Sequence, residues 1–196
     1  MSGDWDAYYA ATAGRPPRRT LLWALDQFVP QPAAARAADL GCGDGRDTIE
    51  LLRRGWEVIA IDAEPRALER LAQRPDLPQG ARLMPCRGRF EEVGWPEVDL
   101  VNASFALPLC RAAEFPALWR KIARSLKPGG RFAGQLYGTR DSWAADRAMM
   151  FFDEADARRL FDAYALEMFD IEESDSVTPR GSAKHWHIFH IVARRR

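Results

Sequence analysis

The feature that most constrains the fold is the stretch Ala38–Asp47, with the sequence ADLGCGDGRD. Three glycines, Gly41, Gly43 and Gly45, alternate with two other residues directly after a short apolar run. Glycine has no Cβ atom, so the backbone can turn sharply there and approach a bound group closely. A helical pattern follows, and the first N–H groups of a helix attract an anion. The stretch therefore predicts a strand, a binding loop and a helix in succession.

The rest of the chain alternates strand and helix patterns, which is typical of an α/β fold with a mostly parallel sheet and helices on both faces. Helices are expected over residues 18–28, 45–55, 64–74, 114–126 and 153–161. Strands are expected over residues 36–40, 56–62, 81–88, 97–105 and 131–138, with Pro85 weakening the third. Two extended runs, 164–176 and 184–196, end the chain and would most simply pair antiparallel.

The length of the chain fits one domain, and its charge gives no electrostatic preference for polyanions. A chain of 196 residues can fill one core and is short for two. We expect a single domain over residues 1–196. Residues 1–32 form an aromatic segment and a helix, a candidate lid, and residues 33–196 form the core. Lys+Arg and Asp+Glu both number 28, so no net charge attracts nucleic acid or a membrane surface.

The cysteines and the N-terminus predict a cytoplasmic protein. The three cysteines have no CxxC spacing, and their odd number argues against a disulfide framework. The N-terminus lacks the pattern of a signal peptide, and no apolar run reaches the roughly 20 residues of a membrane helix. We expect neither a membrane nor a nucleic-acid partner, and the sequence leaves a monomer and a homodimer both open.

Two classes of cofactor fit the glycine loop, a dinucleotide through its pyrophosphate and S-adenosylmethionine through its carboxylate. The dinucleotide fingerprint GxGxxG would need a third glycine where this chain has Arg46. Asp62 lies about 20 residues after Gly41, where an acid accepts hydrogen bonds from ribose hydroxyls of either cofactor. Asp39 would repel a pyrophosphate but can hold an ammonium group. These residues favour S-adenosylmethionine over NAD.

The chain resembles the class I S-adenosylmethionine-dependent methyltransferases from about Ala33 onward. The resemblance is carried by ADLGCGDGRD, VIAIDAEP, VDLVNASFALPLC and LKPGGRFAGQLYG. Within that family it looks most similar to small-molecule enzymes of the tellurite-resistance and thiopurine-methylating kind. The resemblance implies a Rossmann-like sheet of seven strands, mostly parallel, whose last strand is antiparallel and inserted as a hairpin.

The resemblance also implies which residues bind the cofactor. The methionine moiety would be surrounded by Asp39, Gly41, Cys42 and Gly43. The ribose would bind Asp62, with Ala63 beside the adenine and Phe90 covering it. The residues near the sulfonium would be Asn102, Ala103 and Ser104. The chain departs from the family at Arg89, where many members carry an acid. It also lacks the Pro-Pro motif that often marks nucleic-acid methylation after Asn102.

Methyl transfer from a sulfonium needs mainly in-line alignment, so no fixed catalytic group is expected, and a general base is needed only for a protonated acceptor. The candidates for a base are Tyr9, His185 and His187, although the two same-face histidines also suit packing in a sheet. We expect no metal site.

The expected acceptor is a small molecule, and five residues are candidates to bind it. They are Trp5, Tyr8, Tyr9, Arg140 and Trp143. Two alternatives stay open at this stage: an NAD(P)-dependent oxidoreductase, and a protein that binds S-adenosylmethionine without catalysis.

Overall fold

The computed structural model describes residues 5–146 and 148–196. Its helices are α1 (Trp5–Thr12), α2 (Arg19–Asp26), α3 (Arg46–Arg53), α4 (Pro65–Ala72), the short 3-10 helix η1 (Leu107–Leu109), α5 (Phe115–Ser125) and α6 (Glu154–Arg159). Its strands are β1 (Arg36–Leu40), β2 (Glu57–Asp62), β3 (Leu83–Arg87), β4 (Val98–Ala103), β5 (Leu126–Gly138), β6 (Phe151–Phe152), β7 (Tyr164–Val177) and β8 (Ala183–Arg195). No helix in these two ranges is long and apolar enough to cross a bilayer.

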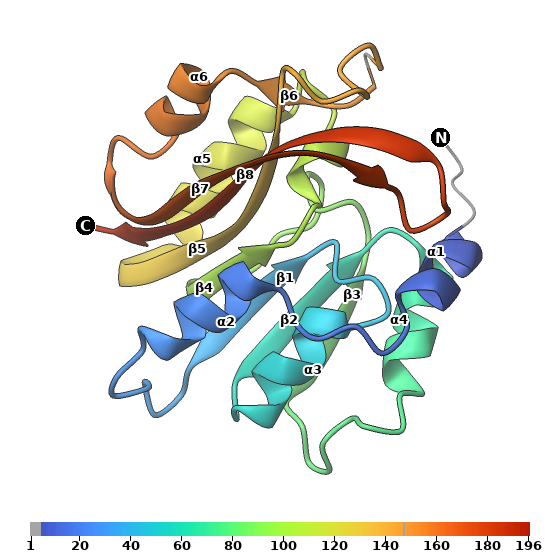
Figure 1. The fold of residues 1–196 in the computed structure, drawn as a ribbon. Coiled ribbons are helices and arrows are strands. Elements are labelled where there is room, and N and C mark those ends of the chain that lie inside the picture. The colour runs from blue at the N-terminus through green and yellow to red at the C-terminus, as the bar shows by residue number, and fades with distance from the viewer. Residues whose placement is uncertain (1–4, 147) are drawn as a thin grey trace.

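The strands form one sheet in the order β3-β2-β1-β4-β5-β8-β7, with β6 paired only to β5. All pairs from β3 to β5 are parallel, and β8 runs antiparallel to both β5 and β7. The predicted Rossmann-like sheet with an antiparallel C-terminal hairpin is confirmed, and the two-residue β6 is an addition to it. Figure 1 shows the long β7–β8 hairpin crossing the molecule beside β5.

Side chains alternate between two apolar layers, one on each face of the sheet. Along β1, Ala38 and Leu40 join the cluster beneath α5 and α6, whereas Ala37 joins the cluster beneath α2, α3 and α4. Strand β4 is buried at all six positions, as expected for a central strand covered on both faces. Helices therefore cover both faces, as predicted (Figure 1).

Two local details differ from the sequence-based expectation. Pro85 does not interrupt β3, because β3 is an edge strand in which a missing N–H donor is tolerated. Strand β5 begins at Leu126 and not at Arg131. Val98 pairs with Leu126 and Leu100 with Arg131, so the Lys-Pro-Gly-Gly sequence forms an irregularity within the strand instead of a turn before it.

The hairpin extends beyond β5 at the end of the sheet where the parallel strands finish. Tyr137, near the end of β5, pairs with Ile188, so the first residues of β8 continue past it. The tip of the hairpin therefore stands over the carboxyl edge of the sheet.

Gly45 offers a test of the loop's packing. Its φ is +89°, and a Cβ atom there would lie 2.3 Å from Cδ1 of the fully buried Leu71. We expect Gly45→Ala to lower the free energy of unfolding by about 2–4 kcal/mol through backbone strain and overpacking. Gly181, with φ +84° and open space around it, is the control and should lose only about 1–2 kcal/mol on the same change. Chemical denaturation measures both, and equal losses would contradict this packing.

Candidate functional site

Three neighbouring parallel strands end at one edge of the sheet and bring the expected cofactor residues together. The glycine loop follows β1, Asp62 ends β2, and Ser104 follows β4. The strand order reverses between β1 and β4, and ligands of open α/β sheets bind outside the carboxyl ends of the strands at such a point.

The glycine loop packs closely against side chains from other parts of the chain. All three of its glycines have positive φ. A Cβ atom at Gly41 would lie 2.8 Å from the Cβ of Ala106 and 3.9 Å from the ring of Phe90. A Cβ atom at Gly43 would lie 3.2 Å from the ring of Tyr9. A larger residue at either position would therefore collide with Ala106 or Tyr9, so the loop needs glycine for its close packing.

Asp62 lies beside the glycine loop with hydrogen-bonding capacity left over. Its two carboxylate oxygens accept the backbone N–H groups of Gly43 and Glu64, both at 2.8 Å. A carboxylate has about four acceptor positions, so it can still accept from two hydroxyl groups. Burial raises the pKa of Asp62, and the backbone donors oppose that shift. This chemistry fits the ribose of a nucleoside.

The segment after β3 is fixed by a lysine that the sequence analysis did not single out. Lys121 of α5 donates to the carbonyl oxygens of Phe90, Glu91 and Val93, at 2.7, 3.0 and 2.6 Å. Arg89, where an acid was expected from the family, pairs with Glu91. The ring of Phe90 is thereby held toward Gly41, as an adenine-covering residue requires.

Beneath the loop lies a buried polar network. Asp39 is 2% exposed and accepts from the Thr48 hydroxyl at 2.6 Å and from the Asn102 amide at 2.9 Å. The same amide reaches Asp47 at 3.2 Å, and Ser104 donates to Asp47 at 2.6 Å. Asp39 and Asn102 therefore join β1, α3 and β4 to one another, and their direct contact with a cofactor stays a prediction.

Asp47 is a buried residue of this network that the sequence analysis missed. It is 5% exposed, and besides Asn102 and Ser104 it accepts the backbone N–H of Arg18 at 2.9 Å. It thus ties the segment before α2 to the carboxyl edge. An acid in the first turn of the helix after the loop was the only signal in the sequence.

Phe105 has an unusual backbone conformation for a bulky residue. Its φ is +57°, and its N–H donates to the side chain of Gln135 at 3.0 Å. Gln135 is buried and donates in turn to the hydroxyl of Thr20 in α2, at 2.8 Å. Bulky residues adopt positive φ only where the surroundings impose it, and such strain clusters at functional sites.

Helix α1 lies against the glycine loop. Asp6 forms ion pairs with Arg66 and Arg70 of α4, and the rings of Trp5, Tyr8 and Tyr9 pack together with centroids 5.7 to 6.3 Å apart. Tyr9 is buried over Gly43. Burial raises the pKa of Tyr9, so its phenol keeps its proton at neutral pH, which suits a hydrogen-bond donor better than a base.

Arg140 contacts His187 at the hairpin and shares the partner Glu173 with His185. Arg140 pairs with Glu173, and its backbone N–H donates to Nδ1 of the buried His187 at 3.2 Å. Burial lowers the pKa of His187, whereas hydrogen bonding to Asp175 raises the pKa of the exposed His185. Within residues 5–146 and 148–196 these side chains show no hydrogen bond to the glycine loop. The structure does not bring them together with Asp62.

Trp143 forms part of an aromatic cage around a buried ammonium group. Lys184 Nζ lies 3.8 Å from the ring centroid of Trp143, 4.4 Å from that of Trp186 and 5.4 Å from that of Tyr137. It pairs with Asp141, and both side chains have no exposed surface. The pair fixes the loop after β5, and no motif in the sequence indicated it.

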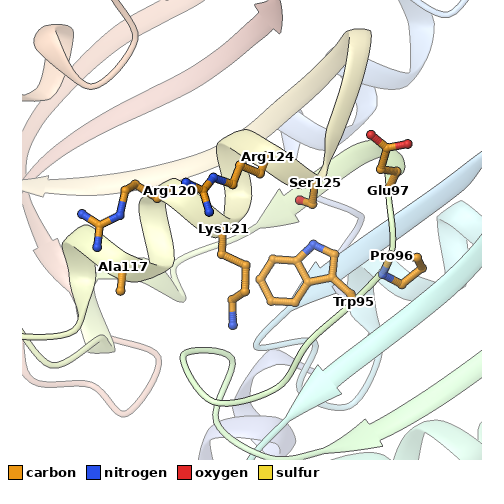
Figure 2. A pocket seen from close by; sticks show the side chains of 8 residues that line it. All are labelled: Trp95, Pro96, Glu97, Ala117, Arg120, Lys121, Arg124 and Ser125. Atoms are coloured by element: carbon orange, nitrogen blue, oxygen red, sulfur yellow. The ribbon is translucent and has the colours of Figure 1, made fainter.

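A shallow groove elsewhere on the surface is not part of this site. Figure 2 shows it between α5 and residues 95–97, with Trp95, Arg120 and Arg124 among its lining side chains. Residues 95–97 precede β4, so the groove lies toward the amino end of that strand. None of its lining residues belongs to the glycine loop or to the ends of β1, β2 and β4.

Asp39 gives the network a measurable pH dependence. Burial, reinforced by the charge of Asp47, raises the pKa of Asp39 to about 7 from an ordinary 3.8. The folded protein therefore keeps a proton that the unfolded chain releases, and this contribution to stability is full at low pH and lost as the pH rises from about 4 to 7. Asp39→Asn cannot ionise. We expect its stability relative to wild type to rise by about 2–4 kcal/mol from pH 4 to pH 8. Denaturant unfolding at each pH measures this, and parallel curves would contradict it.

The caged lysine predicts a strong destabilisation when it is removed alone. Lys184→Met leaves the buried Asp141 carboxylate unpaired, so we expect a loss of about 3–5 kcal/mol in the free energy of unfolding. The double variant Lys184→Met/Asp141→Asn buries no charge and should recover part of that loss. A double variant that is less stable than Lys184→Met would contradict the pairing.

Comparisons with known proteins agree with this geometry. A family model described as a methyltransferase domain matches residues 37–130. An uncharacterised methyltransferase of Mycobacterium tuberculosis is 36% identical over 118 residues, covering 60% of this chain and 45% of that protein. This chain thus spans less than half of the length of the curated relatives it matches first.

Solved structures share the fold. TehB from Haemophilus influenzae superposes with a TM-score of 0.78 at 12% identity, covering 98% of this chain and 67% of TehB. A 1,6-didemethyltoxoflavin-N1-methyltransferase of Burkholderia thailandensis, solved with 1,6-didemethyltoxoflavin and S-adenosylhomocysteine bound, gives 0.70 at 21% identity, covering 97% and 82%. Residues 37–130 thus match a methyltransferase domain, and the chain shares its fold with solved S-adenosylmethionine-dependent methyltransferases.

Proposed function

We propose that this chain binds S-adenosylmethionine at the carboxyl edge of its sheet and transfers the methyl group to a small-molecule acceptor. The observation that carries the proposal is the Asp62 carboxylate, which accepts the N–H of Gly43 and is thereby held beside the glycine loop at the carboxyl edge of the sheet. An acid at the end of β2 and a glycine loop after β1 suit a nucleoside. The loop lacks the third glycine of the dinucleotide fingerprint, which favours S-adenosylmethionine over NAD.

The residues around the glycine loop fit each part of the cofactor. Asp62 can accept from the ribose hydroxyls, and Phe90 can cover the adenine beside Gly41. Helix α3 has Gly45 at its N-cap with no side-chain cap, so its first N–H groups are available to the methionine carboxylate. Cys42, Ala63 and Ala103 are proposed contacts through their positions next to these groups.

When bound, the cofactor supplies a methyl group on a sulfonium. A lone pair of the acceptor forms the new bond to the methyl carbon, and the electron pair of the broken carbon–sulfur bond stays on sulfur. The protein's task is to align the acceptor and to exclude water, and alignment can contribute about 7–11 kcal/mol to such a reaction. Tyr9, Ala106 and Phe90 pack around the loop. No side chain in this proposal has to remove a proton before the transfer.

The enclosure by α1 and by the hairpin supports a small acceptor. Tyr9 lies on the loop, and the tip of the β7–β8 hairpin projects over the same edge. The balanced charge of the chain offers no general attraction to nucleic acid. The 1,6-didemethyltoxoflavin-N1-methyltransferase, which shares the fold, was solved with 1,6-didemethyltoxoflavin bound. A lid role for α1 and a cytoplasmic location are parts of the same proposal.

Asp62 provides the direct test. We expect Asp62→Asn to weaken binding of S-adenosylhomocysteine by at least about tenfold, because hydrogen bonds to a charged group are worth about 1.5–3 kcal/mol. Asp26→Asn is the matched control, because Asp26 pairs with Arg54 on the surface. Isothermal titration calorimetry measures the affinities. Unchanged affinity in Asp62→Asn, or binding of NAD in preference to S-adenosylhomocysteine, would contradict the proposal.

A further inference from the structure

Three arginines near the glycine loop have no acidic partner. Arg15, Arg18 and Arg46, called here the arginine cluster, form no ion pair within the described ranges 5–146 and 148–196. Their neighbour Arg19, by contrast, pairs with Asp170 at 2.8 Å. The cluster is therefore a local concentration of positive charge in a chain without net charge.

Arg46 carries a donor that the protein leaves unused. Its Nε donates to the carbonyl oxygen of Pro16 at 2.6 Å, but its Nη1 is buried and has no partner. Burial lowers the pKa of Arg46, and the nearby charges of Arg18 and Arg15 lower it further. A buried charged donor without an acceptor is costly, so its retention points to an anion that it meets.

Arg18 presents its guanidinium in a similar way. The guanidinium lies 4.4 Å from the ring centroid of Phe105 and makes no hydrogen bond to the described residues. The charge of Asp47 acts on Arg46, but the oxygens of Asp47 already accept from Arg18 N, Asn102 and Ser104. The protein therefore does not neutralise the guanidinium groups internally.

Aromatic rings surround the cluster. Phe105 lies beneath Arg18 and contacts Tyr137 with 6.0 Å between ring centroids. The Tyr8 phenol is within electrostatic reach of both Arg46 and Tyr137. These residues come from α1, from the loop after β4 and from the end of β5, all at the edge where the methyl group would be delivered.

We propose that the arginine cluster, with Tyr8, Phe105 and Tyr137, recognises the methyl acceptor, and that this acceptor is a small aromatic acid with a carboxylate or phosphate group. The proposal rests on the proposed function. The cofactor's own carboxylate has a separate place at the first N–H groups of α3. The Arg18 guanidinium lies over the ring of Phe105, which follows Ser104 and contacts Tyr137. An acceptor ring can lie against these aromatic faces.

Benzoate and phenyl phosphate are suitable probes, with benzamide as the neutral compound of similar size. The protein loaded with S-adenosylhomocysteine is titrated with each probe and followed by NMR. We expect both anions to bind and to shift the amide signals of Phe105 and its neighbours, and benzamide to bind at least about tenfold more weakly.

Arg18→Gln and Arg46→Gln test the residues themselves. Each should weaken binding of both anions by at least about tenfold and leave benzamide unchanged. Arg18→Gln removes no hydrogen bond within the protein, so it keeps the test valid if Arg46→Gln is unstable. Arg19→Gln is the matched control and should behave as wild type, because Arg19 pairs with Asp170 on the surface.

The other carboxylate that the cluster can bind is that of the cofactor. Separate titrations with S-adenosylhomocysteine and with methylthioadenosine, which lacks the amino-acid group, test for it. If the variants weaken S-adenosylhomocysteine alone and leave the benzoate affinity unchanged, the cluster binds the cofactor and the proposal is wrong. Equal binding of benzoate and benzamide would also overturn it. Failure of wild type to bind S-adenosylhomocysteine at all would contradict the proposed function itself.

Discussion

The arrangement of the site depends on one buried amide that contacts two carboxylates. Asn102 donates to Asp39 at 2.9 Å and to Asp47 at 3.2 Å, and all three side chains are almost fully buried. These contacts connect β1, the first turn of α3 and β4 directly under the glycine loop. Two carboxylates this close are stable only when donors surround them, which explains why Thr48, Ser104 and Arg18 N–H also point inward.

The same network determines where the N-terminal segment lies. Asp47 accepts the N–H of Arg18, and Thr20 two residues later receives the side-chain amide of Gln135. The chain before α2 is therefore held against the carboxyl edge, while Asp6 attaches α1 to α4. A segment far from Asp62 in sequence thus packs on the glycine loop beside it. The positions of α1 and of the arginine cluster are consequences of this attachment.

Much of the fold and part of the site could be predicted from the sequence. The glycine loop, Asp62 and Ser104 each follow a strand pattern, and the carboxyl ends of neighbouring parallel strands meet at one edge. The antiparallel hairpin followed from two extended runs joined by a short polar loop. These inferences depend on local periodicity and on general rules of sheet topology, so they need no knowledge of distant contacts.

The missed residues all depend on contacts between distant parts of the chain. Asp47 receives Asn102 and Ser104 from 55 and 57 residues away. Lys121 reaches carbonyl groups 28 to 31 residues earlier, and Lys184 meets Asp141 across 43 residues. The sequence gives no sign of the positive φ of Phe105 either, because the Gln135 side chain that receives its N–H lies 30 residues later.

Hydrogen–deuterium exchange with and without S-adenosylhomocysteine tests most directly whether the carboxyl edge is the binding site. The account predicts slower exchange at residues 41–45, 62–64 and 88–91 when the ligand is present, with unchanged exchange at residues 95–97 and 120–125 around the groove of Figure 2. Protection confined to that groove, with the glycine loop unaffected, would contradict it.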